Sequence, residues 1–258
     1  MRNIKLTIEY DGTNYNGWQI QHKDQKRKSG RVKTIQGVLE GALFNLLGER
    51  VRLISSSRTD SGVHAEGHAA NFKTSTRMKP AQIKSALNSF LPADISVKKA
   101  EEVSLDFNSQ YDSKSKTYRY LICNNDYISP FIKKYAYHFR RPLDIRLMKK
   151  EAAALLGRHD FRAFMSSSKN TDGEPRQNCV KTITRLDIRS KSGLIKIVIE
   201  ADGFLYNMAR NIVGTLIEAG RGRFSPGSAK RILKSKDRRL AGPTVPAKGL
   251  WLEMVKFR

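Results

Sequence analysis

The stretch TIQGVLEGALFNLLG, Thr34–Gly48, is the clearest helix signal in the chain. Its apolar side chains recur at intervals of three and four residues, which places them on one face of an α-helix. Thr34 is suited to cap the amino end and Gly48 to stop the carboxyl end. The apolar positions are Ile35, Val38, Leu39, Ala42, Leu43, Leu46 and Leu47. The spacing therefore predicts an amphipathic helix whose apolar face packs on a sheet.

Alternating side chains on both sides of this helix predict strands. Ile4, Leu6, Ile8 and Tyr10 alternate with polar residues, which is the period of a half-buried strand. Further strands are expected near 50–56, 68–74 and 95–102, and a second helix over 80–91. The first part of the chain therefore follows the order βαββαβ.

The second part repeats this order of elements without repeating the sequence. It predicts strands at 117–123, 182–189, 194–201 and 249–257, helices at 144–157 and around 212–217, and a short basic helix opening at 225. The expected fold class is therefore α+β, with two ferredoxin-like βαββαβ units, antiparallel sheets and an active-site cleft between them. The predicted domains are 1–104 and 105–258.

Positive charge is the dominant feature of the composition. The chain carries 48 Lys and Arg against 24 Asp and Glu, a formal net charge of +24. A globular chain this basic repels itself, and a polyanion that releases counterions on binding offsets that repulsion. Nucleic acid is therefore the expected partner, and the basic segments 23–33 and 221–239 are expected to contact its phosphates. In 221–239, Asp237 is the only acidic residue among eight basic ones.

The cysteines and the hydropathy pattern indicate where in the cell the protein is expected. Cys123 and Cys179 lie far apart and neither belongs to a C-x-x-C pair, so no zinc site or disulfide framework is expected. No apolar run approaches the ~18 residues of a membrane-spanning helix, and no signal-peptide pattern opens the chain. We expect a cytoplasmic protein without membrane contact.

The segment SSSRTDSGVHA, 55–65, is the leading candidate for chemistry because it follows a predicted strand and is too polar for a core. In an extended backbone, side chains two apart share a face, so Arg58 would lie beside Asp60. A guanidinium there would keep the carboxylate ionised and oriented, ready to act as nucleophile or base. Gly62 allows a close approach or a positive φ, and His64 lies within reach of the loop. An isolated R-x-D is also typical of a surface salt bridge, so this pattern alone leaves both interpretations open.

Sequence signatures of several cofactor-dependent reactions are missing. The chain has no G-x-x-x-x-G-K-[ST] loop, no H-E-x-x-H and no strand-linked G-x-G-x-x-G, so we expect neither a cofactor nor a metal. Carboxylates act without metals at glycosidic carbons, where they stabilise an oxocarbenium-like centre or form an ester. The C1′ atom of a ribonucleoside is such a carbon.

Motifs along nearly the whole chain resemble those of the TruA-type tRNA pseudouridine synthases. They occur in the family's order and include YDGTNYNGWQIQ (10–21), TIQGVLEGAL (34–43), SRTDSGVHA (57–65), LPADISV (91–97), KTYRY (116–120), GRHDFRAF (157–164), DGFLYNMARNIVGTL (202–216) and PAKGLWL (246–252). The RTDSGVHA block is the most specific of them.

This resemblance implies an isomerase that converts uridine to pseudouridine at positions 38, 39 and 40 of the tRNA anticodon stem and loop, without a cofactor. Asp60 would be the catalytic carboxylate, held by Arg58. Tyr118 would contact the target base, Arg210 would face the aspartate from the other unit, and Leu250 would line an apolar wall beside the uracil. The resemblance also suggests a homodimer.

One position departs from the family pattern. Members commonly have F-x-A-R-[FY]-S-A between the two halves, whereas this chain has FNSQYDS over 107–113. Gln110 therefore stands at the position of the arginine, so the resemblance does not carry a substrate contact over to this residue.

Two other function classes compete with the isomerase. A noncatalytic RNA-binding protein with two RRM-like sheets would account for the charge and the element order, but not for SSSRTDSGVHA, and the aromatic-rich RRM strand motif is absent. A carboxylate nuclease or glycosidase would require paired acids, and Glu66 is the only nearby candidate in sequence.

Overall fold

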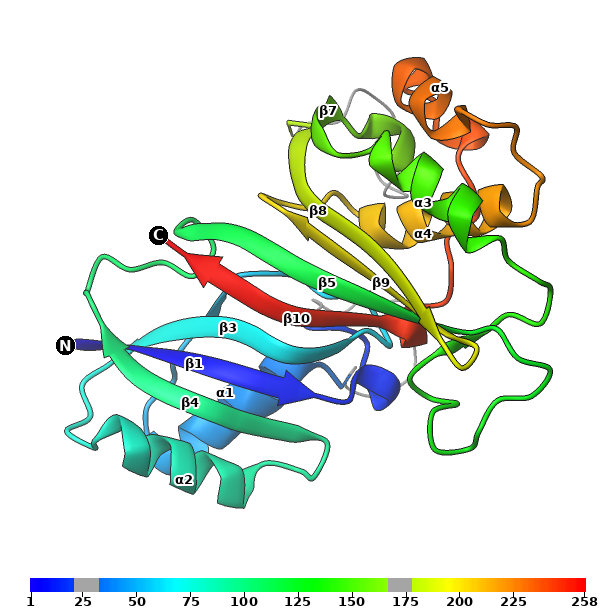
Figure 1. Cartoon of the computed structure of the whole chain (residues 1–258). Coiled ribbons are helices and arrows are strands. Elements are labelled where there is room, and N and C mark those ends of the chain that lie inside the picture. The colour runs from blue at the N-terminus through cyan, green and yellow to red at the C-terminus, as the bar shows by residue number, and fades with distance from the viewer. Residues whose placement is uncertain (21–32, 167–177) are drawn as a thin grey trace, which may run out of the picture. The chain divides into compact units, whose positions relative to one another are not determined.

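The computed structural model describes residues 1–20, 33–166 and 178–258 and separates the chain into two compact units (Figure 1). The first unit contains 1–114 and 251–258, and the second contains 115–250. The sequence-based division at 104/105 assigns the last strand to the second unit, whereas the structure groups nearly all of it with the first. Helices and strands occur in both units, so the predicted α+β class is confirmed. The predicted loop 23–33 lies outside the described residues except for its last position.

The sheet of the first unit has the order β4-β1-β3-β10, with the two-residue strand β2 beside β3. Strand β1 is antiparallel to both β3 and β4, and β2 is antiparallel to β3. Strand β10 runs parallel to β3, where Trp251 and Leu252 pair with His64 and Ala65. The expectation of a wholly antiparallel sheet is therefore wrong at this pairing. The strands are β1 (Arg2–Tyr10), β2 (Ile54–Ser55), β3 (His64–Thr74), β4 (Ile95–Val103) and β10 (Leu250–Phe257).

Two helices, α1 (Ile35–Leu47) and α2 (Pro80–Phe90), lie on one face of this sheet (Figure 1). The predicted caps of α1 are confirmed: the Thr34 hydroxyl accepts a hydrogen bond from Gly37 N at 3.2 Å, and Gly48 ends the helix with φ +69°. The core between helices and sheet consists of fully buried apolar side chains, among them Ile4, Leu6, Ile8, Ile35, Leu39, Leu43, Phe72, Ile83 and Leu87.

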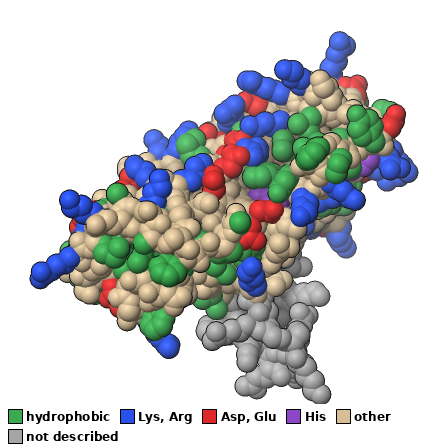
Figure 2. Space-filling view, turned by 90° about the horizontal axis from the view of Figure 1, so that it is seen from below, with side chains coloured by type: hydrophobic (Ala, Val, Ile, Leu, Met, Phe, Trp, Pro, Cys, Tyr) green, Lys and Arg blue, Asp and Glu red, His purple; other side chains and the backbone are tan. Residues whose placement is uncertain are grey.

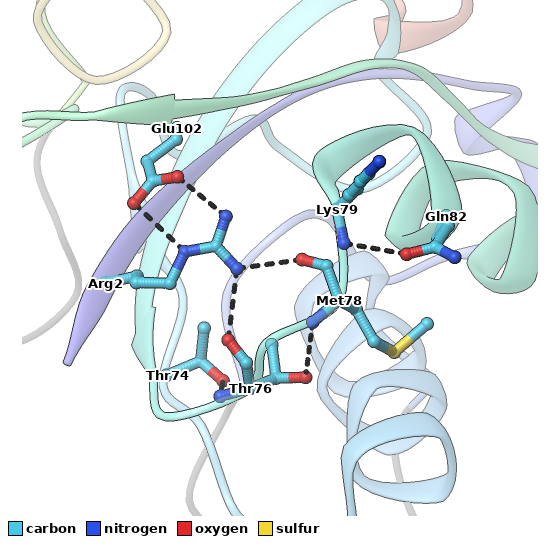
Figure 3. Close-up of polar contacts among 7 residues, drawn as sticks. All are labelled: Arg2, Thr74, Thr76, Met78, Lys79, Gln82 and Glu102. Carbon is cyan, nitrogen blue, oxygen red and sulfur yellow. Dashed lines mark hydrogen bonds and ion pairs between the residues drawn. The ribbon is translucent and has the colours of Figure 1, made fainter.

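Arg2 joins three segments at one end of this sheet (Figure 3). Its Nε and Nη2 donate to the two carboxylate oxygens of Glu102 on β4, at 3.0 and 2.6 Å. Its Nη1 donates to the carbonyls of Thr76 and Met78, at 3.1 and 2.8 Å. The side chain therefore ties the start of β1 to the end of β4 and to the segment that leads into α2.

The sheet of the second unit has the order β5-β9-β8-β7, and neighbouring strands are antiparallel. A two-residue strand, β6, pairs with β5 in the parallel direction. The strands are β5 (Ser113–Cys123), β6 (Tyr137–His138), β7 (Gly157–Asp160), β8 (Val180–Lys191) and β9 (Leu194–Ala201). The helix expected over 144–157 ends earlier, and its last residue begins β7.

The helices of the second unit are α3 (Ile145–Ala153), α4 (Met208–Gly220) and α5 (Ser228–Ser235). Helix α4 is buried over almost its whole length, and α3 contacts both α4 and β8. Glu151 of α3 is 4% exposed and accepts hydrogen bonds from Gly227 N and Ala229 N, at 2.6 and 2.8 Å. A carboxylate at the amino end of a helix is electrostatically favourable, so Glu151 fixes the start of α5.

Four 3₁₀ turns complete the described elements, at Gly12–Asn14, Arg162–Phe164, Arg238–Leu240 and Ala247–Gly249. Among the described residues, no helix combines the length and the apolar character that crossing a membrane requires. Lys and Arg side chains are scattered over the face drawn in Figure 2.

Candidate active site

The loop between β2 and β3 carries Asp60 on a tightly held turn. Val63 N donates to the Asp60 carbonyl at 3.1 Å, and Gly62 within the turn has φ +77°, as its identity predicted. Thr59 and Val63 are buried on either side, whereas Asp60 itself is half-buried. The carboxylate therefore stands on a backbone that is anchored on both flanks.

The segment that follows β1 supplies most of this anchoring. Trp18 N donates to the Thr59 carbonyl at 3.0 Å, while Gly62 N and the Ser61 hydroxyl donate to the Tyr15 carbonyl at 3.3 and 3.1 Å. The two motifs YDGTNYNGW and SRTDSGVHA are thus the two halves of one local structure.

Gly17 allows the closest approach between these two motifs. Its φ is +82°, and a Cβ added there would lie 2.5 Å from the Thr59 carbonyl oxygen. Such a distance is far below a normal contact, so no other residue fits without moving the loop.

The hydroxyl of Tyr15 adds a second support. It donates to Oδ1 of Asp94, beyond the end of α2. Burial, then the hydrogen bond and the negative charge of Asp94, raise the pKa of Tyr15 well above its usual range. This keeps the phenol protonated and fixes the residue whose carbonyl holds the turn.

A buried histidine links the two sides of the loop. The Tyr10 hydroxyl lies 2.7 Å from Thr59 Oγ1 and 3.0 Å from His68 Nδ1. On the other side of the same ring, His68 Nε2 lies 2.8 Å from Ser55 Oγ. Trp18 stacks on the His68 ring, with centroids 3.8 Å apart and an interplanar angle of 13°. The residue before the loop and the residue next to Asp60 are therefore connected through one imidazole.

Sequence reasoning assigned no role to His68. The signal lies in the pairing of Ile8 with His68 between β1 and β3, which brings the imidazole next to Tyr10. These two positions lie far apart in the sequence, so no local pattern predicts their pairing.

His64 is part of the same support. Its ring is fully buried, stacks on Trp251 with centroids 4.5 Å apart, and accepts a hydrogen bond from Gly12 N at 3.1 Å. The residue expected within reach of the loop therefore joins β3, β10 and the turn after β1.

Arg58 does not occupy the place that its spacing from Asp60 predicted. Its side chain is exposed. Within the described parts of the chain, no hydrogen bond or ion pair joins it to Asp60. Thr59, beside the carboxylate, is held by a hydrogen bond between its hydroxyl and that of Tyr10 and by one from Trp18 N to its carbonyl.

The remaining predicted residues belong to the second unit. Tyr118 lies on β5, is 6% exposed, and contacts Phe204 edge to face with ring centroids 4.8 Å apart. Its neighbour across the sheet is Ile199 of β9. The ring is thus held between the sheet and the 202–207 segment.

Arg210, in the first turn of α4, is oriented by two hydrogen bonds. Its Nε donates to the Val245 carbonyl and its Nη1 to Asn207 Oδ1, both at 2.8 Å. Tyr120 lies close by: burial raises the pKa of its phenol, the charge of Arg210 opposes that rise, and the hydroxyl donates to the Pro246 carbonyl at 2.7 Å. Arg210 and Tyr120 therefore fix adjacent carbonyls, Val245 and Pro246, in the loop before the 3₁₀ turn Ala247–Gly249.

Leu250 follows that segment, after the 3₁₀ turn Ala247–Gly249, and is 5% exposed. The structure thus brings Arg210 together with the segment that leads to Leu250. It places Asp60 and Arg58 in the first unit and Tyr118, Arg210 and Leu250 in the second.

Comparison with known proteins identifies the family. A family model described as tRNA pseudouridine synthase matches residues 6–112 and 152–258. The chain is 47% identical to tRNA pseudouridine synthase A of Caldicellulosiruptor saccharolyticus and 44% identical to that of Acetivibrio thermocellus, with 100% of each chain covered. It is 45% identical to tRNA pseudouridine synthase A 2 of Clostridium tetani, over 98% of this chain and 97% of that one. The chain therefore belongs to the tRNA pseudouridine synthase family.

Proposed function

We propose that the chain isomerises uridine to pseudouridine at positions 38, 39 and 40 of the tRNA anticodon stem and loop, with Asp60 as the catalytic carboxylate. Family membership and relatives that match over the full length support the tRNA substrate. The observation that carries the assignment of Asp60 is its place on a turn that two motifs of the family pattern hold in one position.

The reaction is an isomerisation that needs no cofactor. The C1′–N1 bond breaks, the uracil turns in place, and C5 bonds to C1′. The hydrogen on C5 is released and N1 gains one, so atoms and electrons balance. Asp60 has three possible roles: it attacks C1′, adds to the base, or takes the C2′ proton.

Residues of both units act on the same nucleotide in this proposal. The base leaves its stack to reach the carboxylate, which costs a few kcal/mol that phosphate contacts offset. Tyr118 contacts the base, Arg210 binds the substrate, and Leu250 provides an apolar wall for the uracil. Arg58, exposed and not paired with Asp60, contacts the RNA from the loop.

We also propose a ferredoxin-like fold for each unit, a cytoplasmic location and a homodimer. Each unit is ferredoxin-like, and the antiparallel order β4-β1-β3 with β2 beside β3 supports this for the first unit. The protein acts in the cytoplasm as a homodimer. Gel filtration with light scattering measures the molar mass and would reveal a monomer.

The function is tested with Asp60→Asn protein, using anticodon-arm RNA that carries tritium at C5 of uridine. We expect tritium release to fall by at least a thousandfold, while the Kd for the RNA changes by less than about threefold. Asp126→Asn removes an exposed carboxylate elsewhere and should leave both values unchanged.

Two results would contradict the proposal. Conversion by Asp60→Asn protein at the normal rate would exclude Asp60 as the catalytic residue. Tight RNA binding by the unaltered protein without any conversion would favour the noncatalytic RNA-binding class.

A further inference from the structure

Two lysines of the second unit lie on one face of its sheet, at the same end. Lys116 of β5 pairs with Ala201 of β9, which in turn pairs with Ile183 of β8, so these three side chains point to the same face. Lys181 lies two residues before Ile183 on β8 and shares that face. The register therefore places both lysines at the same end of the strands, on either side of the end of β9.

The segment after β9 places this pair beside Tyr118. Lys181 covers Gly203: a Cβ added to that glycine would lie 3.5, 3.6 and 3.8 Å from its Cδ, Cε and Nζ atoms. The next residue, Phe204, contacts the ring of Tyr118. On β5, Lys116 is two residues before Tyr118, about 7 Å along the strand and on the same face. Both lysines thus adjoin the residue proposed to contact the base.

Within 1–20, 33–166 and 178–258, no acidic side chain pairs with either of these two lysines. Asp202, the residue before Gly203, instead accepts a hydrogen bond from Thr182 N at 2.9 Å. Burial lowers the pKa of Lys116, and the positive charge of Lys181 lowers it further. Holding two like charges together at a half-buried position costs free energy, which an anion would recover.

We propose that Lys116 and Lys181 together bind one backbone phosphate of the RNA, next to the nucleotide whose base contacts Tyr118. This inference rests on the proposed function. A phosphate is the anion that an RNA presents beside every base, and two ammonium groups on flexible stems bind it as point charges without reading sequence. The pair would hold the target nucleotide by its backbone while the base is out of its stack.

The test compares Lys116→Gln, Lys181→Gln and the double variant, each in Asp60→Asn protein so that binding is measured without conversion. The Kd for anticodon-arm RNA is determined between 50 and 200 mM salt. Each single variant should weaken binding about 5- to 20-fold and lower the slope of log Kd against log salt by about 0.7 to 0.9, the value for one phosphate contact. Because both lysines serve one phosphate, the double variant should lower the slope by little more than either single variant.

The matched control is Lys191→Gln, which removes the same charge from an exposed position at the far end of β8. Its Kd and slope should stay unchanged. Lys116→Met separates binding from a structural role: it should bind RNA as weakly as Lys116→Gln and yet melt at the same or a higher temperature than the parent protein, because it removes a like-charge contact.

Several outcomes would overturn the inference. Unchanged Kd and slope in both single variants would exclude phosphate binding, and slope losses that add fully in the double variant would exclude one shared phosphate. A Lys116→Met protein that melts well below the parent would assign Lys116 a structural role. These results do not depend on turnover, so they remain distinct from a failure of the isomerase assignment, which would appear as bound RNA without released tritium.

Discussion

The hydroxyl of Tyr10 lies 2.7 Å from that of Thr59, the residue next to Asp60. The same hydroxyl reaches His68, which is stacked on Trp18 and bonded to Ser55 at the other end of the loop. A strand, a turn and a loop that are far apart in sequence are therefore joined around one buried imidazole. This network holds Thr59, the residue next to the proposed catalytic carboxylate.

Tyr10→Phe tests that positioning role. It leaves Thr59 and His68 without a shared partner in a buried site, so the free energy of unfolding should fall by about 1 to 2 kcal/mol. We expect kcat for tritium release to fall about 3- to 10-fold while KM stays within twofold, because the change affects the carboxylate's position and not RNA binding. Tyr127→Phe, at a 74% exposed side chain, is the control and should alter neither value. A Tyr10→Phe enzyme with normal kcat would show that the network only stabilises the fold.

Gly17→Ala tests the close approach of the two motifs. The substitution combines a positive φ with a contact of 2.5 Å to the Thr59 carbonyl, whereas Gly48→Ala has a similar φ of +69° and nothing within 4 Å. Urea unfolding should show a loss of about 1 kcal/mol for Gly48→Ala and about 2 to 4 kcal/mol for Gly17→Ala. Equal losses would mean that the loop moves away from residue 17 without cost.

The elements that depend on local pattern could be predicted from the sequence. The expected helix over 34–48 is α1, Ile35–Leu47, because its spacing and both caps are local signals. The strand expected near 50–56 is reduced to Ile54–Ser55, because only these residues pair with β3. Strand β7 is defined by its pairing with β8, which local periodicity does not reveal. Strand β10 belongs to the first unit because it pairs with β3, a strand far away in the sequence.

The candidate site shows the same limit. A polar loop after a strand identified Asp60, and the glycine at 62 predicted the positive φ that the turn has. The contact between Arg58 and Asp60, expected from their spacing and from the family resemblance, is not formed among the described residues, where the loop follows its long-range hydrogen bonds and not an extended path. The surroundings of His68 and the proximity of Lys116 to Lys181 depend on strand register, which local sequence patterns do not predict.

Tyr15 predicts a dependence of stability on alkaline pH. Its pKa is raised in the folded protein, so this residue's contribution is fully present below the unfolded value near 10 and is lost as the pH rises through the folded value. Above pH 10 the unfolded chain releases this proton first, and the free energy of unfolding falls. We expect Tyr15→Phe to be less stable than the parent at pH 8 and to lose less stability between pH 9 and 11. The difference between the two urea-unfolding curves isolates Tyr15 from the lysines that titrate in the same range; parallel pH profiles would contradict the assignment.

The basic segment 221–239 contains side chains that hold the fold and side chains that are exposed. Arg221 and Arg223 both pair with Glu218, an acid that precedes the segment on α4. Arg238 donates to Asn211 Oδ1 and to the Gly242 carbonyl, both at 2.9 Å. Lys230 and Lys234 of α5 are exposed and form no ion pair among the described residues.

We therefore expect Lys230→Gln combined with Lys234→Gln to weaken RNA binding and to lower its salt slope by as much as about 1.8, while the melting temperature changes little. Arg238→Gln should do the opposite, because it removes the donor to the Gly242 carbonyl and one of the two donors to Asn211 Oδ1, the other being the Thr244 hydroxyl at 2.6 Å. The protein should lose about 1 to 3 kcal/mol of stability, and the salt slope of the folded fraction should stay near the parent's. Salt titrations of Kd and urea unfolding, measured on the same preparations, separate the two effects. If the lysine variant binds RNA normally, α5 does not contact the RNA, and other basic residues of the protein bind the phosphates.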